Sequence, residues 1–444
     1  MRVPNELNIG DRRYGTLIDF DDSTPHVNVT LERDKRGIRL TISWPDYESP
    51  FAAWFVSGKY GLPASETSPP ATPVPKNLLF QDSHGLVLLV GCWKRGFRSS
   101  VFGPGTGFIR ARYAIFNVEH NTDFRYVNGL KTEVTGLRDW LEISSVQRDF
   151  ETRSAEHPIR LIVTASSDDS LSVASDPPFR FIPSWSVSTD EDRVVVGDLL
   201  RVETTHSELI DVRDAEKLHL AMRDLLVLSH WRAEICIPLA VMRRDDPDAQ
   251  DFDGKYGDYW RDLVPAVYEK RPKARDTSEH LILFSEVGLA GLEKWIKLRD
   301  EFARALDPVV STRFLDGVSA TSLLAQTGPA IEALGYLLFL RDGKSADQAA
   351  RAYLRSRLDR IAREVAGVMP FDVAEWAAET VIAYNAVKHA NRILPAEVDV
   401  LNRWRESVLI TRVWVALELG SDRDELRKRI VNSPQSSPYS VVAN

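Results

Sequence analysis

The chain has 444 residues, of which 43% are hydrophobic and 27% charged, and this balance is typical of a folded globular protein. A chain of this length is expected to form two or three domains rather than a single core. No run reaches the ~18 to 20 apolar residues that cross a bilayer, and the first residues lack the apolar stretch of a signal peptide. We therefore predict a cytoplasmic protein without a membrane partner.

The net charge of −8 is unevenly distributed along the chain. The segment from Glu286 to Asn444 contains 21 Lys+Arg and 21 Asp+Glu, so residues 1–285 carry the whole acidic excess. Because an acidic surface repels phosphate, any contact with nucleic acid is expected in the C-terminal part.

The first part of the chain has the pattern of β structure. Residues His26–Leu31 and Gly37–Trp44 alternate apolar and polar side chains with a period of two, as half-buried strands do. Leu86–Cys92 is a short apolar run after a turn signal and predicts a buried strand. Further strands are predicted at Ile109–Val118 and Ile159–Ala165, and a proline-rich exposed loop at 61–76.

A second β-rich stretch is predicted from Phe179 to Glu203, after which the apolar period becomes helical. Leu218, Met222 and Leu225 recur three and four residues apart, which predicts a helix over Ala215–Val241. The charged, proline-containing segment Arg243–Arg275 predicts a long surface connection, and the domain boundary is placed after it, near residue 280. Its aromatic residues Tyr256, Tyr259 and Trp260 are expected to anchor it.

From Gly288 onward the sequence predicts a compact all-helical domain. Its helices are bounded by recognisable caps: Ser345 and Asp372 are predicted N-caps, Gly367 and Pro370 end the third helix, and Gly420 ends the fifth. Five helices joined by short connections indicate an up-and-down bundle. The predicted helices are Gly291–Leu306, Ser319–Leu340, Ser345–Val365, one from Asp372 to before Pro395, and Val398–Leu419, followed by a short Asp422–Ile430.

The predicted fold class is therefore α+β and multidomain. Residues 1–280 form a β-rich, sandwich-like region with a sensing or regulatory role, divided into two sub-domains near 150–175. Residues 286–432 form the helical bundle, and 433–444 form a flexible tail rich in Ser and Pro.

One segment of the fourth helix, Tyr384 to His389, combines the side chains that phosphodiester cleavage needs. Asn385 and His389 are four residues apart and Arg392 follows three later, so all three are expected on one helix face. A histidine can move the proton of a ribose 2′-hydroxyl as general acid and base, and a cation can stabilise charge developing on phosphorus. The alternative is that His389 only closes the last turn of the helix, where the macrodipole favours its imidazolium.

Three other side chains of the helical region have two interpretations each. Arg351 and Arg355 share a face of the third helix, as a phosphate-binding surface or as part of a solvated helix with ion pairs. Glu332 lies beside the apolar stripe of the second helix, where it either pairs with a basic group across the bundle or marks the edge of the core.

Several kinds of site are not expected. The sequence has no phosphate-binding Gly-x4-Gly-Lys-Ser/Thr loop and no His-Glu-x-x-His or Gly-x-Ser-x-Gly element. The histidines are not at metal-ligand spacing, and Cys92 and Cys236 lack a Cys-x-x-Cys partner. Neither a metal nor another cofactor is predicted, and the β-rich part has no predicted catalytic residue.

The order of these parts resembles the ApeA-like proteins of bacterial anti-phage defence, which have an N-terminal β-rich domain followed by a C-terminal helical HEPN domain. The resemblance covers most of the chain and rests on the order of short matching segments rather than on any one of them. These segments are Gly15–Asp19, Leu78–Cys92, Leu137–Leu141, Leu292–Trp295, Gly328–Leu334, Asn385 with His389, and the last long helix ending at Gly420.

The resemblance implies a metal-independent endoribonuclease that acts as an abortive-infection effector. The HEPN signature is an arginine and a histidine separated by four to six residues, often with asparagine directly after the arginine. Asn385 and His389 match this signature, but Tyr384 stands in the place of the arginine, and a neutral phenol does not replace a guanidinium. The resemblance also implies a homodimer or higher homo-oligomer with a composite site, an RNA substrate such as tRNA, and a phage protein as trigger.

Three interpretations of Tyr384 stay open. Arg392 supplies the cation, or an arginine of the third helix supplies it, or the domain has lost cleavage and retains RNA binding, dimerisation or a scaffold role. Lys388 adds a further cation next to the His389 face. We favour the nuclease, because a bundle helix would accept Leu or Ala where this polar cluster stands. A His389 side chain buried against Trp376 or Trp404 would favour the non-catalytic protein.

Overall fold

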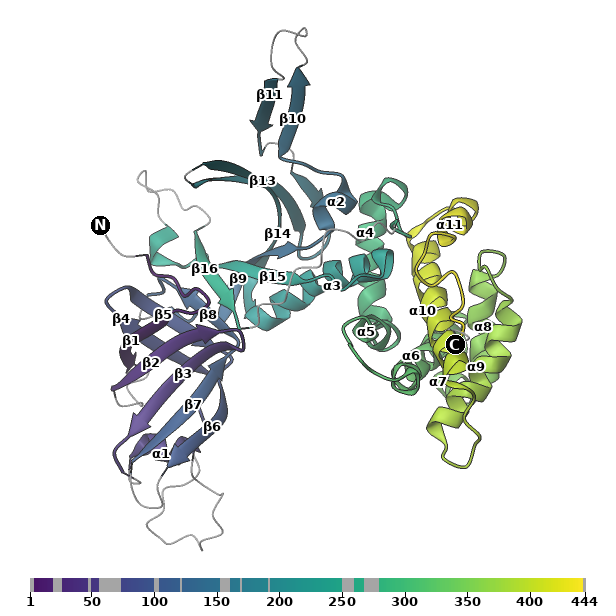
Figure 1. The fold of residues 1–444 in the computed structure, drawn as a ribbon, viewed down its shortest axis with the longest axis horizontal. Coiled ribbons are helices and arrows are strands. Elements are labelled where there is room, and N and C mark those ends of the chain that lie inside the picture. Colours follow the sequence, from purple (N-terminus) through teal and green to yellow (C-terminus); the bar gives the residue numbers. More distant parts are fainter. Residues whose placement is uncertain are drawn as a thin grey trace, which may run out of the picture. The chain divides into compact units, whose positions relative to one another are not determined.

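A computed structural model describes residues 4–18, 26–46, 49–55, 73–99, 104–119, 122–151, 160–167, 170–190, 192–249, 259–266 and 279–441 (Figure 1). The chain divides into two compact units that are interleaved in sequence. Unit 1 consists of residues 1–133, 201–217 and 236–270, and unit 2 of residues 134–200, 218–235 and 271–444. The predicted boundary near residue 280 divides the chain only once, whereas the chain passes between these units several times.

Unit 1 is built on one large sheet, and every strand pair in it with a described register is antiparallel. The strand order is β14-β9-β15-β16-β8-β5-β4-β1-β2-β3-β7-β6, with the second part of β14 belonging to this unit. The strands are β1 (Arg12–Ile18), β2 (Val27–Asp34), β3 (Gly37–Trp44), β4 (Asn77–Asp82), β5 (Gly85–Val90), β6 (Trp93–Ser99), β7 (Gly105–Ala111), β8 (Tyr113–Phe116), β9 (Tyr126–Val134), β14 (Arg193–Asp211), β15 (Cys236–Met242) and β16 (Trp260–Pro265).

The apolar patterns of the strands follow from two hydrophobic cores on opposite faces of this sheet. In β3 the apolar residues Ile38, Leu40 and Ile42 are buried in the first core, and the residues between them face outward. Strands β4, β5 and β8 contribute alternate residues to both cores, so their sequences are apolar at almost every position. The short helix α1 (Pro50–Phe55) closes the first core, with the rings of Trp44 and Phe55 stacked at a centroid distance of 5.3 Å.

Strand predictions are largely confirmed, and three boundaries were wrong. The stretch Ile109–Val118 forms parts of two strands, β7 and β8, on either side of Arg112. The predicted helix Ala215–Val241 is α3 (Val212–His230) followed by β15, because Trp231 takes a positive φ of 55° that a helix does not continue. The predicted connection Arg243–Arg275 contains a 3-10 turn at Pro247–Ala249 and strand β16. Tyr256 and most of the predicted loop at 61–76 lie outside the described residues.

Unit 2 contains the C-terminal helices, so the predicted α+β class is confirmed. It also contains the second part of α3, the two-stranded ribbon β10–β11, and strands β12 and β13 with the first part of β14. Its elements are α2 (Leu137–Leu141), β10 (Val146–Glu151), β11 (Arg160–Ala165), β12 (Leu171–Val173), β13 (Phe179–Asp190), α4 (Phe284–Glu301), α5 (Ala303–Thr312), α6 (Ala320–Arg341), α7 (Ala346–Arg351), α8 (Leu354–Val365), α9 (Val373–Lys388), α10 (Glu397–Leu419) and α11 (Arg423–Ile430).

The predicted helix caps are confirmed, but two predicted helices are each broken in two. Ser345 forms a capping box with Gln348, Asp372 accepts hydrogen bonds from two backbone amides of α9, and Gly420 takes the left-handed conformation at the end of α10. The predicted first helix is divided at Phe302 into α4 and α5. The predicted third helix is divided into α7 and α8, because Ala352 and Tyr353 are both extended.

Helix α6 is, within the described part of the chain, the helix long and apolar enough to cross a membrane by length and composition. It packs against α5, α8, α9 and α10, and residues along its length are buried, including Leu324, Ile331 and Leu338. These contacts are those of a core helix in a helical domain.

Helix α10 is the centre of unit 2, since it packs against α4, α5, α6, α8, α9 and α11. Its Arg412 side chain is fully buried. The guanidinium donates to the backbone oxygens of Leu228 (2.6 Å) and Ser229 (2.9 Å) at the end of α3, to Ser433 Oγ (2.8 Å) and to Gln435 Oε1. Burial lowers the pKa of Arg412 to about 9, and these four acceptors offset that penalty on the charged form.

The same contacts correct the prediction of a flexible tail from residue 433. Ser433 and Gln435 are buried, and the Asn402 side chain of α10 donates to the Tyr439 carbonyl (2.9 Å) and accepts from its amide (2.7 Å). The Ser/Pro composition indicated mobility, but the segment supplies polar partners for buried groups of α10. Residues 442–444 lie outside the described residues.

Replacement of Arg412 by methionine is expected to lower the free energy of unfolding by about 3 kcal/mol, because at least two buried carbonyls lose their donor. Chemical denaturation of the purified chain measures this change. Arg427→Met is the matched control, since Arg427 is exposed on α11, and it should change stability by less than about 0.5 kcal/mol. Equal effects of the two substitutions would contradict the role given to Arg412.

A second buried polar cluster contains His280. Its Nδ1 lies 3.0 Å from Ser229 Oγ, and its ring lies 4.5 Å from the ring of His230, centroid to centroid. Burial lowers the pKa of His280 to about 4, and nearby His230 and Arg232 contribute in the same direction, partly opposed by Asp139. At neutral pH the His280 ring is therefore uncharged.

This shift predicts a loss of stability in mild acid. An unfolded histidine binds a proton near pH 6.5 whereas folded His280 does so near 4, so unfolding becomes easier as the pH falls from about 6.5 to about 4. The expected loss is on the order of 3 kcal/mol. In denaturation curves across this range, His280→Phe should show a flatter pH dependence, while His26→Phe, at an exposed position, should keep the parental profile. Parallel profiles for parent and His280→Phe would contradict this.

Candidate functional site

The candidate site lies at the C-terminal end of α9. Helix α9 ends at Lys388, and His389 is its cap, with extended dihedral angles and its amide donating to the Asn385 carbonyl (2.9 Å). The amide of Arg392 donates in turn to the His389 carbonyl (3.0 Å). The prediction that all three side chains share one helix face was therefore wrong for Arg392, which lies in the turn after the helix.

The end of α9 presents a group of basic side chains to solvent. Lys388, His389 and Arg392 are all exposed, and Asn385 is half-buried. Trp376 is buried and donates to Ser407 Oγ (3.2 Å). Since His389 is exposed, it is not buried against Trp376 or Trp404.

Tyr384 lies inside the domain, and of the basic side chains at the end of α9 it contacts that of Lys388. Its ring is buried against Gly328 of α6, where a Cβ atom would come within 2.3 Å of the ring. The Lys388 ammonium lies 5.7 Å from the ring centroid. Burial raises the pKa of Tyr384, and the carboxylate of Glu332 raises it further. The position that would hold an arginine in the HEPN signature is thus filled by a neutral ring in the α6–α9 interface.

Glu332 has a basic partner across the domain, which settles its two interpretations in favour of pairing. Its Oε1 accepts from Arg357 Nη1 of α8 at 2.6 Å. The same guanidinium donates to the carbonyls of Ala349 (3.1 Å) and Ala350 (2.8 Å) at the end of α7, and Arg357 is buried. Arg357 therefore joins three helices and is committed to these contacts.

The break between α7 and α8 separates Arg351 from Arg355. Arg351 is the last residue of α7 and is exposed, whereas Arg355 lies in α8 and forms an ion pair with Asp359 (2.8 Å). Further along α8, Arg360 pairs with Asp342 (2.6 Å) and with Glu364. Helix α8 thus has the surface of a solvated helix with ion pairs, one of the two interpretations drawn from the sequence. The role of Arg351 and Arg355 in RNA binding stays a prediction.

Metal-binding geometry is not found in the part of the chain that the structure describes, where no three or more His, Cys, Asp or Glu side chains gather as ligands. Cys92 is buried and Cys236 half-buried, and burial raises the pKa of Cys92.

Two features of the site were missed in the sequence. Gly328 accommodates the Tyr384 ring, and only the packing of α6 against α9 reveals this. The Tyr384–Lys388 contact has the spacing of four residues that brings helix side chains together, so the sequence contained a signal for it.

The N-terminal and central parts of the chain match a known family. Residues 14–295 match the family described as ApeA N-terminal domain 1. Because this match covers more than half of the chain, the protein belongs to the ApeA family, a family of anti-phage defence proteins. No curated protein and no solved structure matches the chain.

The close packing of Gly328 and Tyr384 predicts an outcome for substitution. Gly328→Ala should lower the free energy of unfolding by about 1–3 kcal/mol, because overpacking outweighs the roughly 1 kcal/mol that alanine gains as a helix former. Chemical denaturation measures this. In the double variant Gly328→Ala/Tyr384→Leu the smaller side chain should restore part of the loss, and strict additivity of the two changes would argue against direct contact.

Proposed function

We propose that the chain is a HEPN-type, metal-independent endoribonuclease that acts as an anti-phage effector, with His389 as general acid and base. In this reaction the ribose 2′-oxygen attacks phosphorus, the bond to the 5′-oxygen breaks, and a 2′,3′-cyclic phosphate and a 5′-hydroxyl result. His389 accepts the 2′-hydroxyl proton or supplies the proton to the leaving oxygen. The observation that carries the proposal is the exposure of His389 beside the cations Lys388 and Arg392 at the end of α9.

The cation of the site is proposed to come from the end of α9. Arg392 follows His389 in the same turn, and Lys388 precedes it. Arg357, an arginine of the predicted third helix, is buried and bound to Glu332 and two carbonyls. Arg392 is therefore the better candidate for stabilising charge on phosphorus, with Asn385 positioning the substrate and Glu332 supporting the domain.

A homodimer fits the apolar side chains around His389. Ile382, two helical turns before His389 and on the same side of α9, is 61% exposed, and Ile393 in the following turn is 93% exposed. Large apolar side chains exposed beside a polar site support contact with a second copy. Two copies would bring together the cations of two α9 ends, which suits an RNA backbone such as that of tRNA. In this proposal the N-terminal region senses a phage protein and restrains the dimer.

A second candidate is a catalytically degenerate HEPN module that binds RNA or serves as a dimerisation scaffold. The observation that favours it is Tyr384, a buried neutral ring at the position of the signature arginine. The two candidates differ in whether His389 is needed for an activity.

The test is cleavage of total RNA and of purified tRNA by the isolated full chain, with gel analysis and detection of cyclic phosphate ends. His389→Ala is expected to lower the rate by about 10²–10⁴-fold, the usual contribution of a general acid or base. His26→Ala, at an exposed position of unit 1, should cleave like the parent. Excess chelator should leave the rate unchanged, and RNA with 2′-deoxyribose at the cleaved position should resist cleavage.

Equal rates for His389→Ala and the parent, or loss of activity with chelator, would contradict the mechanism. Absence of cleavage by a folded parent in the presence of phage lysate, combined with loss of dimer on Ile382→Asp, would favour the scaffold. Retained cleavage in Tyr384→Phe would agree with a packing role for this ring.

A further inference from the structure

The outer face of strands β1, β2, β3, β7 and β6 in unit 1 carries aligned rows of polar and aromatic side chains; we call it the polar face. The strand register places five residues in one row across these strands. In the strand register, Arg12 of β1 lies opposite Glu32 of β2, and Glu32 lies opposite Arg39 of β3. Arg39 lies opposite Arg110 of β7, and Arg110 lies opposite Trp93 of β6. Laterally paired residues in a sheet point to the same side, so these five side chains share one face.

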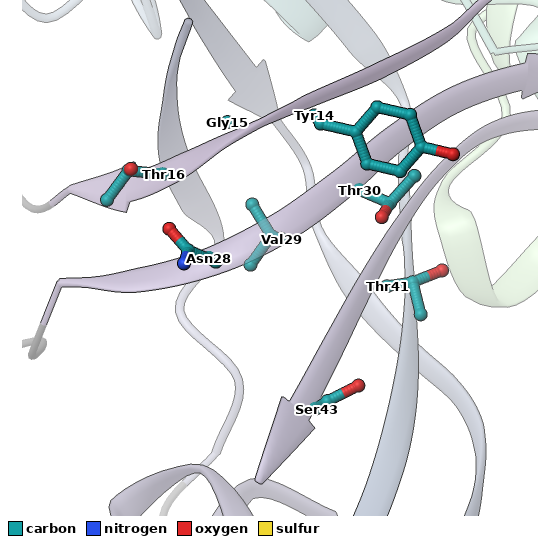
Figure 2. Close-up of a pocket in the computed structure, with 8 residues that line it drawn as sticks. All are labelled: Tyr14, Gly15, Thr16, Asn28, Val29, Thr30, Thr41 and Ser43. Atoms are coloured by element: carbon teal, nitrogen blue, oxygen red, sulfur yellow. The ribbon is translucent and has the colours of Figure 1, made fainter.

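The next row on the same face contains Tyr14, Thr30, Thr41 and Phe108. Figure 2 shows Tyr14, Thr30 and Thr41 on neighbouring strands beside a shallow hollow of about 440 Å³. The opposite face of these strands is buried in the first core. Tyr14 is 71% exposed although it is aromatic. An exposed aromatic ring among hydroxyl side chains provides a flat apolar surface with hydrogen-bonding groups around it.

A second hollow on the polar face, also about 440 Å³, is basic and aromatic. It is lined by Arg36, Arg39, Arg95, Arg110, Trp93 and Phe108 together with Gly96, and none of these described lining residues is acidic. Trp93 is 43% exposed, although tryptophan is usually buried. This gathering of four arginines around two aromatic rings is a local feature of the surface. Unit 1 as a whole lies in the part of the sequence that carries the acidic excess.

The ion pairs of the polar face leave an excess of positive charge. Glu32 is shared between Arg12 and Arg39, and Asp34 accepts from Arg110 (3.3 Å). Arg36 and Arg95 are exposed, and neither side chain makes an ion pair or hydrogen bond with another described residue. Burial and the neighbouring guanidinium groups of Arg110 and Arg12 lower the pKa of Arg39, which agrees with crowding of like charge.

The aromatic residues span the polar face from one edge to the other. Trp93 and Phe108 lie on adjacent strands, and the Arg39 guanidinium lies 5.6 Å from the Phe108 ring centroid. Tyr14 lies three strands from Phe108, which corresponds to about 14 Å at the usual spacing of about 4.8 Å between strands. The rings are therefore separated by distances that one extended polymer can span.

We propose that the polar face binds a single-stranded nucleic acid, with bases stacked on Trp93 and Tyr14 and phosphates at Arg36 and Arg95. Aromatic side chains on a sheet with a basic groove are the combination that binds unpaired bases, because every base has a stacking face and the backbone is anionic. A duplex hides its bases and would use only the charges. This inference does not rest on the ribonuclease activity, and it differs from the expectation that nucleic acid contacts only the C-terminal part.

The experiment measures binding of the full chain to fluorescein-labelled single-stranded DNA of about 12 nucleotides by fluorescence anisotropy. DNA lacks the 2′-hydroxyl, so no cleavage by the proposed ribonuclease interferes, and His389→Ala should bind this probe like the parent. Single-stranded RNA of the same sequence, on the His389→Ala background, shows whether the polar face prefers one sugar. A duplex of the same sequence separates stacking from charge.

Trp93→Ala is expected to weaken binding about tenfold, the loss of one base stacked on an aromatic ring. Trp93→Phe should retain most of the affinity, which shows that the alanine variant does not act through misfolding. Trp185→Ala is the matched control, because Trp185 of unit 2 is 45% exposed, close to the exposure of Trp93. This control should bind like the parent.

Arg36→Gln/Arg95→Gln is expected to reduce the slope of log affinity against log salt by about 0.7 for each arginine that contacts phosphate. Arg213→Gln/Lys217→Gln removes the same charge from exposed positions of α3 and should leave the slope unchanged. The proposal is overturned if the parent does not bind the single strand at about 100 µM protein in low salt. Equal affinity for duplex and single strand, or parental binding by Trp93→Ala, also overturns it.

Discussion

The packing of unit 2 depends on the hydrogen bonds made by one buried charged side chain, Arg412. Arg412 lies at the centre of α10 with no exposed surface, and its guanidinium is surrounded by the last carbonyls of α3 and by side chains from residues after α11. The end of a helix leaves carbonyls without partners, and a buried guanidinium needs acceptors. The Arg412 guanidinium supplies the donors that the carbonyls at the end of α3 need, and these carbonyls supply acceptors for the guanidinium. Helix α10 packs against α6 and α9 and so positions the candidate site. Through Arg412 it is hydrogen-bonded to segments almost 200 residues earlier and about 20 residues later in the chain.

The local signals of the sequence predicted much of this architecture. Alternation in β3 and the caps at Ser345, Asp372 and Gly420 are properties of a few adjacent residues, so they are visible without a structure. The breaks at Phe302 and at Ala352–Tyr353 contain neither glycine nor proline, and tertiary packing determines them. The long-range partners of Arg412 could not be predicted for the same reason, since nothing near α10 in sequence identifies Leu228 or Gln435.

Charge totals were a poor guide to the β-rich unit because they average over surfaces that the fold separates. Arg39, Arg110 and Trp93 come from three segments, and only the strand register places them in one row. The acidic residues that dominate the total are elsewhere or are already paired, as Glu32 and Asp34 are. A protein with net charge −8 can thus present a basic aromatic surface. Periodicity predicted which residues of β3 face outward, but not which neighbours they would have.

The packing of α6 against α9 explains why position 384 holds a tyrosine. A guanidinium at this position would have to enter an interface shaped for a flat ring, which lies so close to α6 that it leaves no space for even a Cβ atom at Gly328. The carboxylate that acts on Tyr384 is Glu332, and its charge is already matched by Arg357. Tyr384 and Gly328 therefore form one packing arrangement between α6 and α9. In the proposed ribonuclease, the cation for phosphate would come from Lys388 in the last turn of α9, from Arg392 in the turn after it, or from the same side chains of a second copy.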